Sequence, residues 1–171
     1  MLSLNVVRRM GPSRMDRGNT HFAPAKTVKY KVFAYITHKQ RLLIFSHPLV
    51  PDAGMQVPAG TLNEGEHPEV AVLREAFEET GLTTLTLASF LGEQVRDMSD
   101  FERNEIHHRR FYHLRCDEEP PLRWRHNELF HTDDPSAPPI TFEFFWAPLP
   151  NEVPHLIADH GIMLPQLLKV L

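Results

Sequence analysis

The sequence predicts an α/β fold in which strands are interspersed with two helices. Apolar and polar side chains alternate through residues 27–37, and this period of two is typical of a strand. Residues 68–80 are bounded like a helix, with Pro68 near the first turn and Gly81 at the C-terminal cap. Strands mixed with helices favour a layered architecture over an all-helical bundle.

The remaining elements follow along the chain. Residues 1–26 are rich in arginine and interrupted by glycine and proline, so we expect an N-terminal extension ahead of a folded domain over 27–171. A turn joins the first strand to a second over 41–46. Further strands are expected at 85–95, 105–116 and 141–147. Loops are expected at 47–55, 96–104 and 117–139. A final helix over 153–171 is kinked or split by Gly161 and Pro165.

Composition excludes several classes of protein. The chain has 171 residues, which suits one domain with a substantial core. Its net charge of −4 argues against general nucleic-acid binding, which needs a basic surface. A single cysteine, Cys116, rules out an intrachain disulfide and favours a cytoplasmic location. Apolar runs are far shorter than the roughly 20 residues of a membrane span.

The predicted helix over 68–80 has an acidic face. Glu78 and Glu79 lie three and four positions after Glu75, so the three carboxylates are neighbours and repel unless a cation lies between them. A hard divalent cation such as Mg²⁺ prefers oxygen ligands of this kind. The side chains expected to pack into the core lie roughly opposite: Val70, Leu73, Phe77 and Thr80. An ordinary solvated glutamate-rich face is the alternative, and the preceding glycine loop with Glu66 argues against it.

The stretch around this helix resembles a known family motif. Residues 60–82, GTLNEGEHPEVAVLREAFEETGL, look like a complete Nudix box. Eight specified positions would match by chance with a probability on the order of 10⁻⁹. Ala76 departs from the pattern, which has a bulky aliphatic residue there. The resemblance continues into 57–59 and, less specifically, into 142–149.

The resemblance implies an α/β/α sandwich around a mixed sheet and a hydrolase that acts on phosphoric anhydrides. The implied substrate is a nucleoside diphosphate linked to another group. The implied cofactor is Mg²⁺, with Mn²⁺ as a substitute. The resemblance assigns metal ligation to Glu75, Glu78, Glu79 and the Gly60 carbonyl.

Arg74 and the general base are the two further predicted elements of catalysis. We expect Arg74 to bridge Glu66 and so to hold the catalytic loop. The base is expected either within the motif, at Glu75, or outside it. The first candidate outside is Glu143, in the strand that resembles the family's last one, and Glu105 and Glu128 are alternatives.

Substrate-binding residues are predicted from two other segments. In residues 105–116 neither strand face is cleanly apolar, so the segment is either an exposed or edge strand, or a strand whose Arg109, Arg110 or His113 grips phosphates. Trp124, in the predicted loop 117–139, either stacks on a base or anchors the loop. Phe130 and His131 are considered with it.

The subfamily, the oligomeric state and one other function stay open. Residues 58–60 resemble the entry to the motif in some ADP-sugar hydrolases, but Met98 stands where those have a proline. We expect a small phosphorylated molecule as the partner, and a homodimer stays open. The alternative function is a catalytically silent Nudix-like domain that binds nucleotides as a sensor or scaffold.

Overall fold

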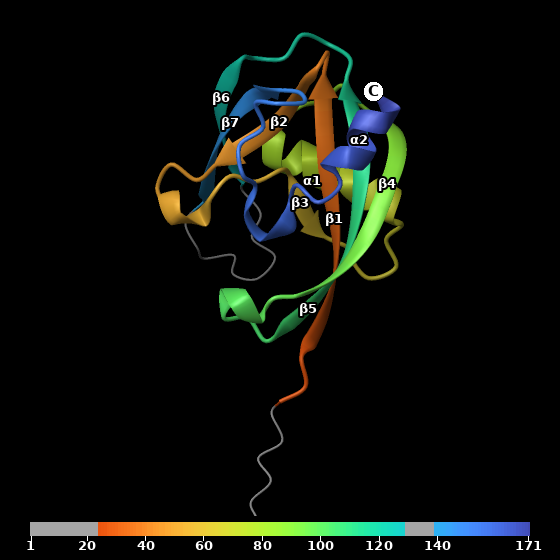
Figure 1. Ribbon diagram of the computed structural model, residues 1–171, viewed down its shortest axis with the longest axis vertical. Coiled ribbons are helices and arrows are strands. Elements are labelled where there is room, and N and C mark those ends of the chain that lie inside the picture. Colours follow the sequence, from red (N-terminus) through yellow and green to blue (C-terminus); the bar gives the residue numbers. More distant parts are fainter. Residues whose placement is uncertain (1–23, 129–138) are drawn as a thin grey trace, which may run out of the picture.

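The computed structural model describes residues 24–128 and 139–171, and most of the predicted N-terminal extension therefore lies outside the described residues. The described part forms seven strands, two α-helices and three short 3₁₀ helices (Figure 1). The strands are β1 (Thr27–His38), β2 (Arg41–Ser46), β3 (Ala59–Thr61), β4 (Leu85–Asp97), β5 (Glu105–Cys116), β6 (Arg123–Glu128) and β7 (Ile140–Pro148). The helices are α1 (Pro68–Thr80), α2 (Leu164–Val170), η1 (Pro51–Ala53), η2 (Ser99–Phe101) and η3 (Ile157–Asp159).

The strands form one mixed sheet in the order β4-β5-β1-β2-β7-β6, with β3 paired to β1 off this path. β1 and β5 run parallel, with Thr27 opposite Glu105, and all the other pairs are antiparallel. The short strand β3 brings Gly60 opposite Val32. The chain enters α1 from this strand, so the sheet fixes where the acidic helix begins.

Two hydrophobic layers cover the two faces of the sheet, as expected for an α/β/α sandwich. On one face, Val32 and its alternate neighbours pack with Ala71, Val72 and Ala76 of α1. On the other face, Tyr35 packs in a second cluster with Leu167 of α2. Figure 1 shows the two helices on opposite sides of the sheet. The predicted fold class is confirmed.

The prediction of which α1 face packs holds for Thr80, which is buried, and for Leu73, which packs against the core, but is wrong for Val70 and Phe77. Val70 and Phe77 are more than half exposed, at 58% and 51%. The helix instead buries its small residues, among them Ala71 and Ala76, together with Glu75 and Glu79. Small side chains let the helix approach the sheet closely, and the two carboxylates are buried because β3 offers them backbone N–H donors. Ala76, the position that departs from the family pattern, is fully buried in this contact.

Three further expectations need correction. β5 is an internal strand between β4 and β1, not an edge strand, and its polar residues His107, Arg109 and His113 are buried. The predicted loop 117–139 contains strand β6, which pairs with β7. The predicted C-terminal helix is confined to the seven residues of α2, preceded by η3. No helix within the described ranges is long and apolar enough to cross a membrane.

Candidate metal-binding and catalytic site

The acidic face of α1 is built around β3. The backbone N–H of Thr61 donates to Glu75 Oε1 at 3.0 Å, and the N–H of Ala59 donates to Glu79 Oε2 at 3.0 Å. Between them, a Cβ on Gly60 would lie 1.7 Å from Glu75 Cδ, so only glycine fits there. Gly60, Glu75 and Glu79 thus meet at one strand–helix contact.

Arg74 connects this contact to the preceding loop. Its Nε and Nη2 each donate to Glu66 at 2.8 Å, which is a two-point grip on one carboxylate. Nη2 also donates to the Thr61 carbonyl at 3.1 Å. Nη1 lies 2.9 Å from Glu75 Oε1 and 3.0 Å from Glu78 Oε2. The Arg74–Glu66 contact expected from the sequence is present, and Arg74 also ties two of the predicted metal ligands to the loop.

Two carboxyl groups of the cluster have shifted pKa values. Hydrogen bonds from Arg74 lower the pKa of Glu66 to about 2, so this carboxylate stays ionised. Burial raises the pKa of Glu75, and the charge of Arg74 only partly opposes this effect. A raised pKa makes Glu75 the better proton acceptor of the two.

The donor set fits a hard divalent cation. Four carboxylates gather near the guanidinium of Arg74, and they belong to Glu66, Glu75, Glu78 and Glu79. Carboxylate oxygens are the ligands that Mg²⁺ and Mn²⁺ prefer. In the part of the chain that the structure describes, no three side chains converge into a ready metal site. Arg74 occupies the position between Glu75 and Glu78, so these carboxylates would have to exchange that contact for a cation.

A cavity of about 320 Å³ opens on the opposite, α2 side of the sheet, beside Ala59. We call it the basic cavity, because its lining includes Lys31, Arg103 and Arg109 against one acid, Asp52. Its other lining residues include Phe33, Gln56, Met98, Phe101, His107, Ile157 and His160. Of the predicted substrate-binding residues, Arg109 lies here. Sequence reasoning missed His160 and Lys31, since nothing in their local pattern marks them as neighbours of β5.

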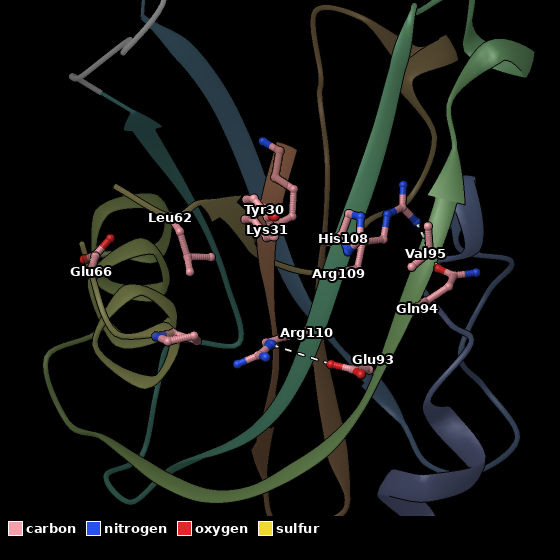
Figure 2. A pocket seen from close by; sticks show the side chains of 11 residues that line it. Tyr30, Lys31, Leu62, Glu66, Glu93, Gln94, Val95, His108, Arg109 and Arg110 are labelled. Atoms are coloured by element: carbon pink, nitrogen blue, oxygen red, sulfur yellow. Dashed lines mark hydrogen bonds and ion pairs between the residues drawn. The ribbon is translucent and has the colours of Figure 1, made fainter. Parts of the chain in front are cut away.

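A second hollow, of about 530 Å³, lies on the α1 side between the helix and strands β4 and β5 (Figure 2). It is lined by Tyr30, Leu62, Glu66 and Val95 among others. Arg110 points into it, and its Nε lies 3.7 Å from Glu93 (Figure 2). Arg109 and Arg110 are adjacent in a strand and therefore point to opposite sheet faces. Both arginines nevertheless line this hollow, and Arg109 lines the basic cavity as well.

Comparison with known families identifies the family of the chain. The model of the NUDIX domain matches residues 28–149, which is more than two thirds of the chain. The chain belongs to the NUDIX domain family. Thus the family expected from residues 60–82 is confirmed, and with it the class of Nudix hydrolases. No curated protein matches this Nudix chain.

Solved structures show the same fold at low identity. A MutT NUDIX hydrolase from Burkholderia pseudomallei is 20% identical over 82% of this chain and 98% of that one, with a TM-score of 0.57. An ADP-ribose pyrophosphatase from Streptococcus suis is 17% identical over 82% and 90%, with a TM-score of 0.52. A bifunctional NMN adenylyltransferase/ADP ribose pyrophosphatase from Francisella tularensis, complexed with AMP and a Mn ion, is 20% identical over 86% of this chain, with a TM-score of 0.53. The Nudix chain spans only 43% of that protein.

Glu143, the first predicted base outside the Nudix motif, does not join the acidic cluster. In β7, Phe142 and Phe144 pack on the α1 side, so Glu143 between them lies on the other sheet face. Its carboxylate contacts Arg125 at 3.1 Å and Arg123 at 3.5 Å. This placement contradicts the expectation that Glu143 points into the cluster.

The other two predicted bases are Glu105 and Glu128. Glu105 accepts a hydrogen bond from His107 at 2.7 Å and contacts Lys29 at 3.0 Å. These contacts lower the pKa of Glu105 to about 2, led by the His107 hydrogen bond, which makes it a poor proton acceptor. The side chain of Glu128 lies outside the described residues. Glu75 is therefore the base candidate within the cluster.

Trp124 packs the Nudix helix and is not a free stacking surface. Its indole N–H donates to the Thr80 carbonyl at 2.9 Å, and its ring stacks on Phe144 with centroids 5.1 Å apart. Both ends of the side chain are thus engaged, which corrects the prediction that it stacks on a base. Phe130 and His131 lie outside the described residues.

Proposed function

We propose that this Nudix protein hydrolyses a diphosphate linkage in a nucleoside diphosphate joined to another group, with Mg²⁺ or Mn²⁺ as the cofactor. The observation that carries the proposal is the acidic cluster that Arg74 and β3 hold in place. Four carboxylates outnumber the cationic side chains near them, Arg74 and the more distant Lys31, and this excess of negative charge is unfavourable without a cation.

The residues of the cluster have separate tasks in this proposal. Glu75, Glu78, Glu79 and the Gly60 carbonyl would hold the cation, which when bound neutralises charge on the phosphate oxygens. Glu66 and Arg74 fix the loop and the first turn of α1, as their two-point contact indicates. Glu75, whose pKa is raised by burial, accepts the proton of the attacking water. Phosphoryl transfer needs positioning more than a covalent nucleophile, so a set of carboxylates is sufficient.

The proposed substrate is a small phosphorylated molecule. The relatives with solved structures include ADP-ribose pyrophosphatases, which supports a nucleotide-linked diphosphate over an inorganic one. We assign the activity to a domain over residues 27–171 and, on the single cysteine, place the protein in the cytoplasm.

A substrate screen tests the proposal. The purified chain is incubated with nucleoside triphosphates, nucleotide sugars and dinucleotides, with Mg²⁺, with Mn²⁺ or with chelator, and products are separated by ion-exchange chromatography. We expect a nucleoside monophosphate from at least one conjugate, and none with chelator. Nucleotide binding without divalent metal, combined with no product across the panel, would establish the silent binding domain instead.

A further inference from the structure

The basic cavity is lined by three cationic side chains and one acidic side chain, Asp52. Among the described residues, none of Lys31, Arg103 and Arg109 lies within ion-pair distance of a carboxylate, although all three line the cavity. The nearest candidate acid for Arg109, Asp159, is held by Arg96 at 3.2 Å. Within the described residues, acids compensate this charge only from a longer range: Glu75, Glu79 and Glu105 act on Lys31, and Asp159 and Asp100 act on Arg109.

Of these three cations, Arg109 is a buried one whose guanidinium is incompletely hydrogen-bonded. It is only 2% exposed, and its Nε has no hydrogen-bond partner. Its other N–H groups contact neutral atoms: the Ala158 carbonyl at 2.5 Å, Met98 Sδ at 3.1 Å and Gln94 Oε1 at 3.5 Å. Burial lowers its pKa to about 10, which still leaves it protonated at neutral pH. An unpaired buried charge is strongly unfavourable unless a ligand compensates it.

The guanidinium of Arg109 points away from the acidic cluster. Arg109 pairs with Lys31, and Lys31 pairs with Thr61 of β3, so Arg109 lies two strand spacings, about 10 Å, from β3. Its contacts are with η3 and β4, on the side of β5 that faces away from β3. Figure 2 shows the side chain reaching toward β4. A group bound by Arg109 is thus separate from a diphosphate held at Glu75.

We infer that the basic cavity binds an anionic group of the substrate beyond the cleaved diphosphate, which selects nucleotide conjugates that carry an additional phosphate. The inference rests on the proposed function and names its substrate class. Arg109 is the residue that determines this specificity, since a guanidinium binds phosphate at two points. Lys31 and Arg103 add positive potential beside it.

A purely structural role for Arg109 makes a different prediction. Ala158, whose carbonyl accepts from Arg109, has a left-handed backbone with φ of 51°, so Arg109 could simply hold η3 in place. In that case replacing Arg109 lowers the melting temperature and weakens the binding of all nucleotides to the same extent. Recognition of an anion instead changes the ratio between ligands that differ only in one phosphate.

Binding to the metal-free full chain separates the two roles. Adenosine 5′-monophosphate is compared by calorimetry with the adenosine 2′,5′- and 3′,5′-bisphosphates. We expect one bisphosphate to bind about tenfold to hundredfold more tightly, the effect of one charged hydrogen-bonded contact. Arg109→Gln should remove this preference. Arg110→Gln, on the neighbouring residue that faces the other side of the sheet, should retain it.

Equal binding of the three ligands by the unmodified chain would overturn the inference, as would a full preference in a folded Arg109→Gln variant. If that variant does not fold, the exposed Arg103→Gln decides, because a reduced preference supports the inference and an unchanged one overturns it. The binding measurement needs no turnover. A chain that prefers a bisphosphate but hydrolyses nothing would refute only the proposed function, and a hydrolase without the preference would refute only this inference.

Discussion

Arg74 reaches its partners because a guanidinium is flat and carries donors on several edges. It holds both oxygens of Glu66, the Thr61 carbonyl, and one oxygen each of Glu75 and Glu78. A lysine ammonium at the same place has one point of charge and no fixed fork. The loop, β3 and the acidic face of α1 are therefore positioned by the shape of one side chain, and not by its charge alone.

Arg74→Lys should weaken metal activation while leaving substrate affinity nearly unchanged. The variant keeps the charge but loses the two-point contact with Glu66, so the loop no longer fixes the ligands. We expect the Mg²⁺ concentration for half-maximal activity to rise about tenfold, which corresponds to one lost hydrogen bond to a charged group. Activity is measured against Mg²⁺ and, separately, against substrate. A change confined to KM would place Arg74 in the substrate-binding site instead.

Glu78→Gln and Glu79→Gln should each reduce turnover by roughly 10² to 10³, the effect of losing about 3 to 4 kcal/mol of electrostatic stabilisation. Each amide preserves the size of the side chain but removes the charge that holds a cation. Turnover is measured as the initial rate at saturating Mg²⁺, and a melting curve checks that each variant is folded. Glu69→Gln, an exposed position on the same helix, is the matched control. Near-normal rates in both variants would exclude these residues as metal ligands.

At the scale of elements, the sequence predicted the ends of α1 better than its orientation. Pro68 and Gly81 mark those ends by their backbone chemistry, and Gly81 adopts the left-handed conformation, with φ of 72°. The packed face was predicted correctly at Leu73 and Thr80 but not elsewhere, because apolar periodicity counts Val70 and Phe77 as core and glutamates as surface. Burial of Glu75 and Glu79 depends on backbone donors of β3, a three-residue strand that no period-two pattern could reveal.

The cavity side of the site was even less predictable from local patterns. Arg109 could be proposed as a phosphate ligand from its position in the strand, but the strand pattern does not show that its side chain lines the basic cavity. Its neighbours Lys31 and His160 come from distant segments that the parallel pairing of β1 with β5 and the position of η3 bring together.

Trp124→Phe should loosen α1 without affecting chemistry. Phenylalanine keeps an aromatic ring beside Phe144 but cannot donate to the Thr80 carbonyl at the end of the helix. We expect the free energy of unfolding to fall by about 1 to 2 kcal/mol, measured by chemical denaturation, with little change in turnover. Leu122→Ala, at a position that is 70% exposed, should change stability by less than about 0.5 kcal/mol. A larger loss of activity than of stability would argue that Trp124 contacts substrate.

For the whole molecule, buried histidines predict sensitivity to mild acid. Burial lowers the pKa values of His47, His107, His113 and His160, and that of His160 falls from 6.5 to about 3. The unfolded chain therefore binds more protons than the folded one between these two values, and stability falls as pH decreases through that window. Each histidine that stays neutral contributes at most about 1.4 kcal/mol per pH unit.

We expect the free energy of unfolding to be nearly constant from pH 8 to 7 and to decline from about pH 6.5 downward. Denaturant titrations at several pH values measure the slope. His160→Gln should make the decline shallower, whereas the same substitution at the exposed His155 should not. An unchanged slope in His160→Gln would mean that this ring is protonated in the folded state. Loss of the Glu66 contribution belongs to a lower window, from pH 4.5 to about 2.

The parallel pairing of β1 with β5 also has a consequence for how the protein folds. Each paired residue of β1 finds its partner 78 positions later in the chain, as Thr27 finds Glu105. Contacts between such distant segments close large loops and are typical of slow-folding topologies. The folding rate of this Nudix domain should therefore be limited by the pairing of β5 with β1. The acidic helix is built from residues close in sequence, so it can form before the basic cavity on the other face of the sheet.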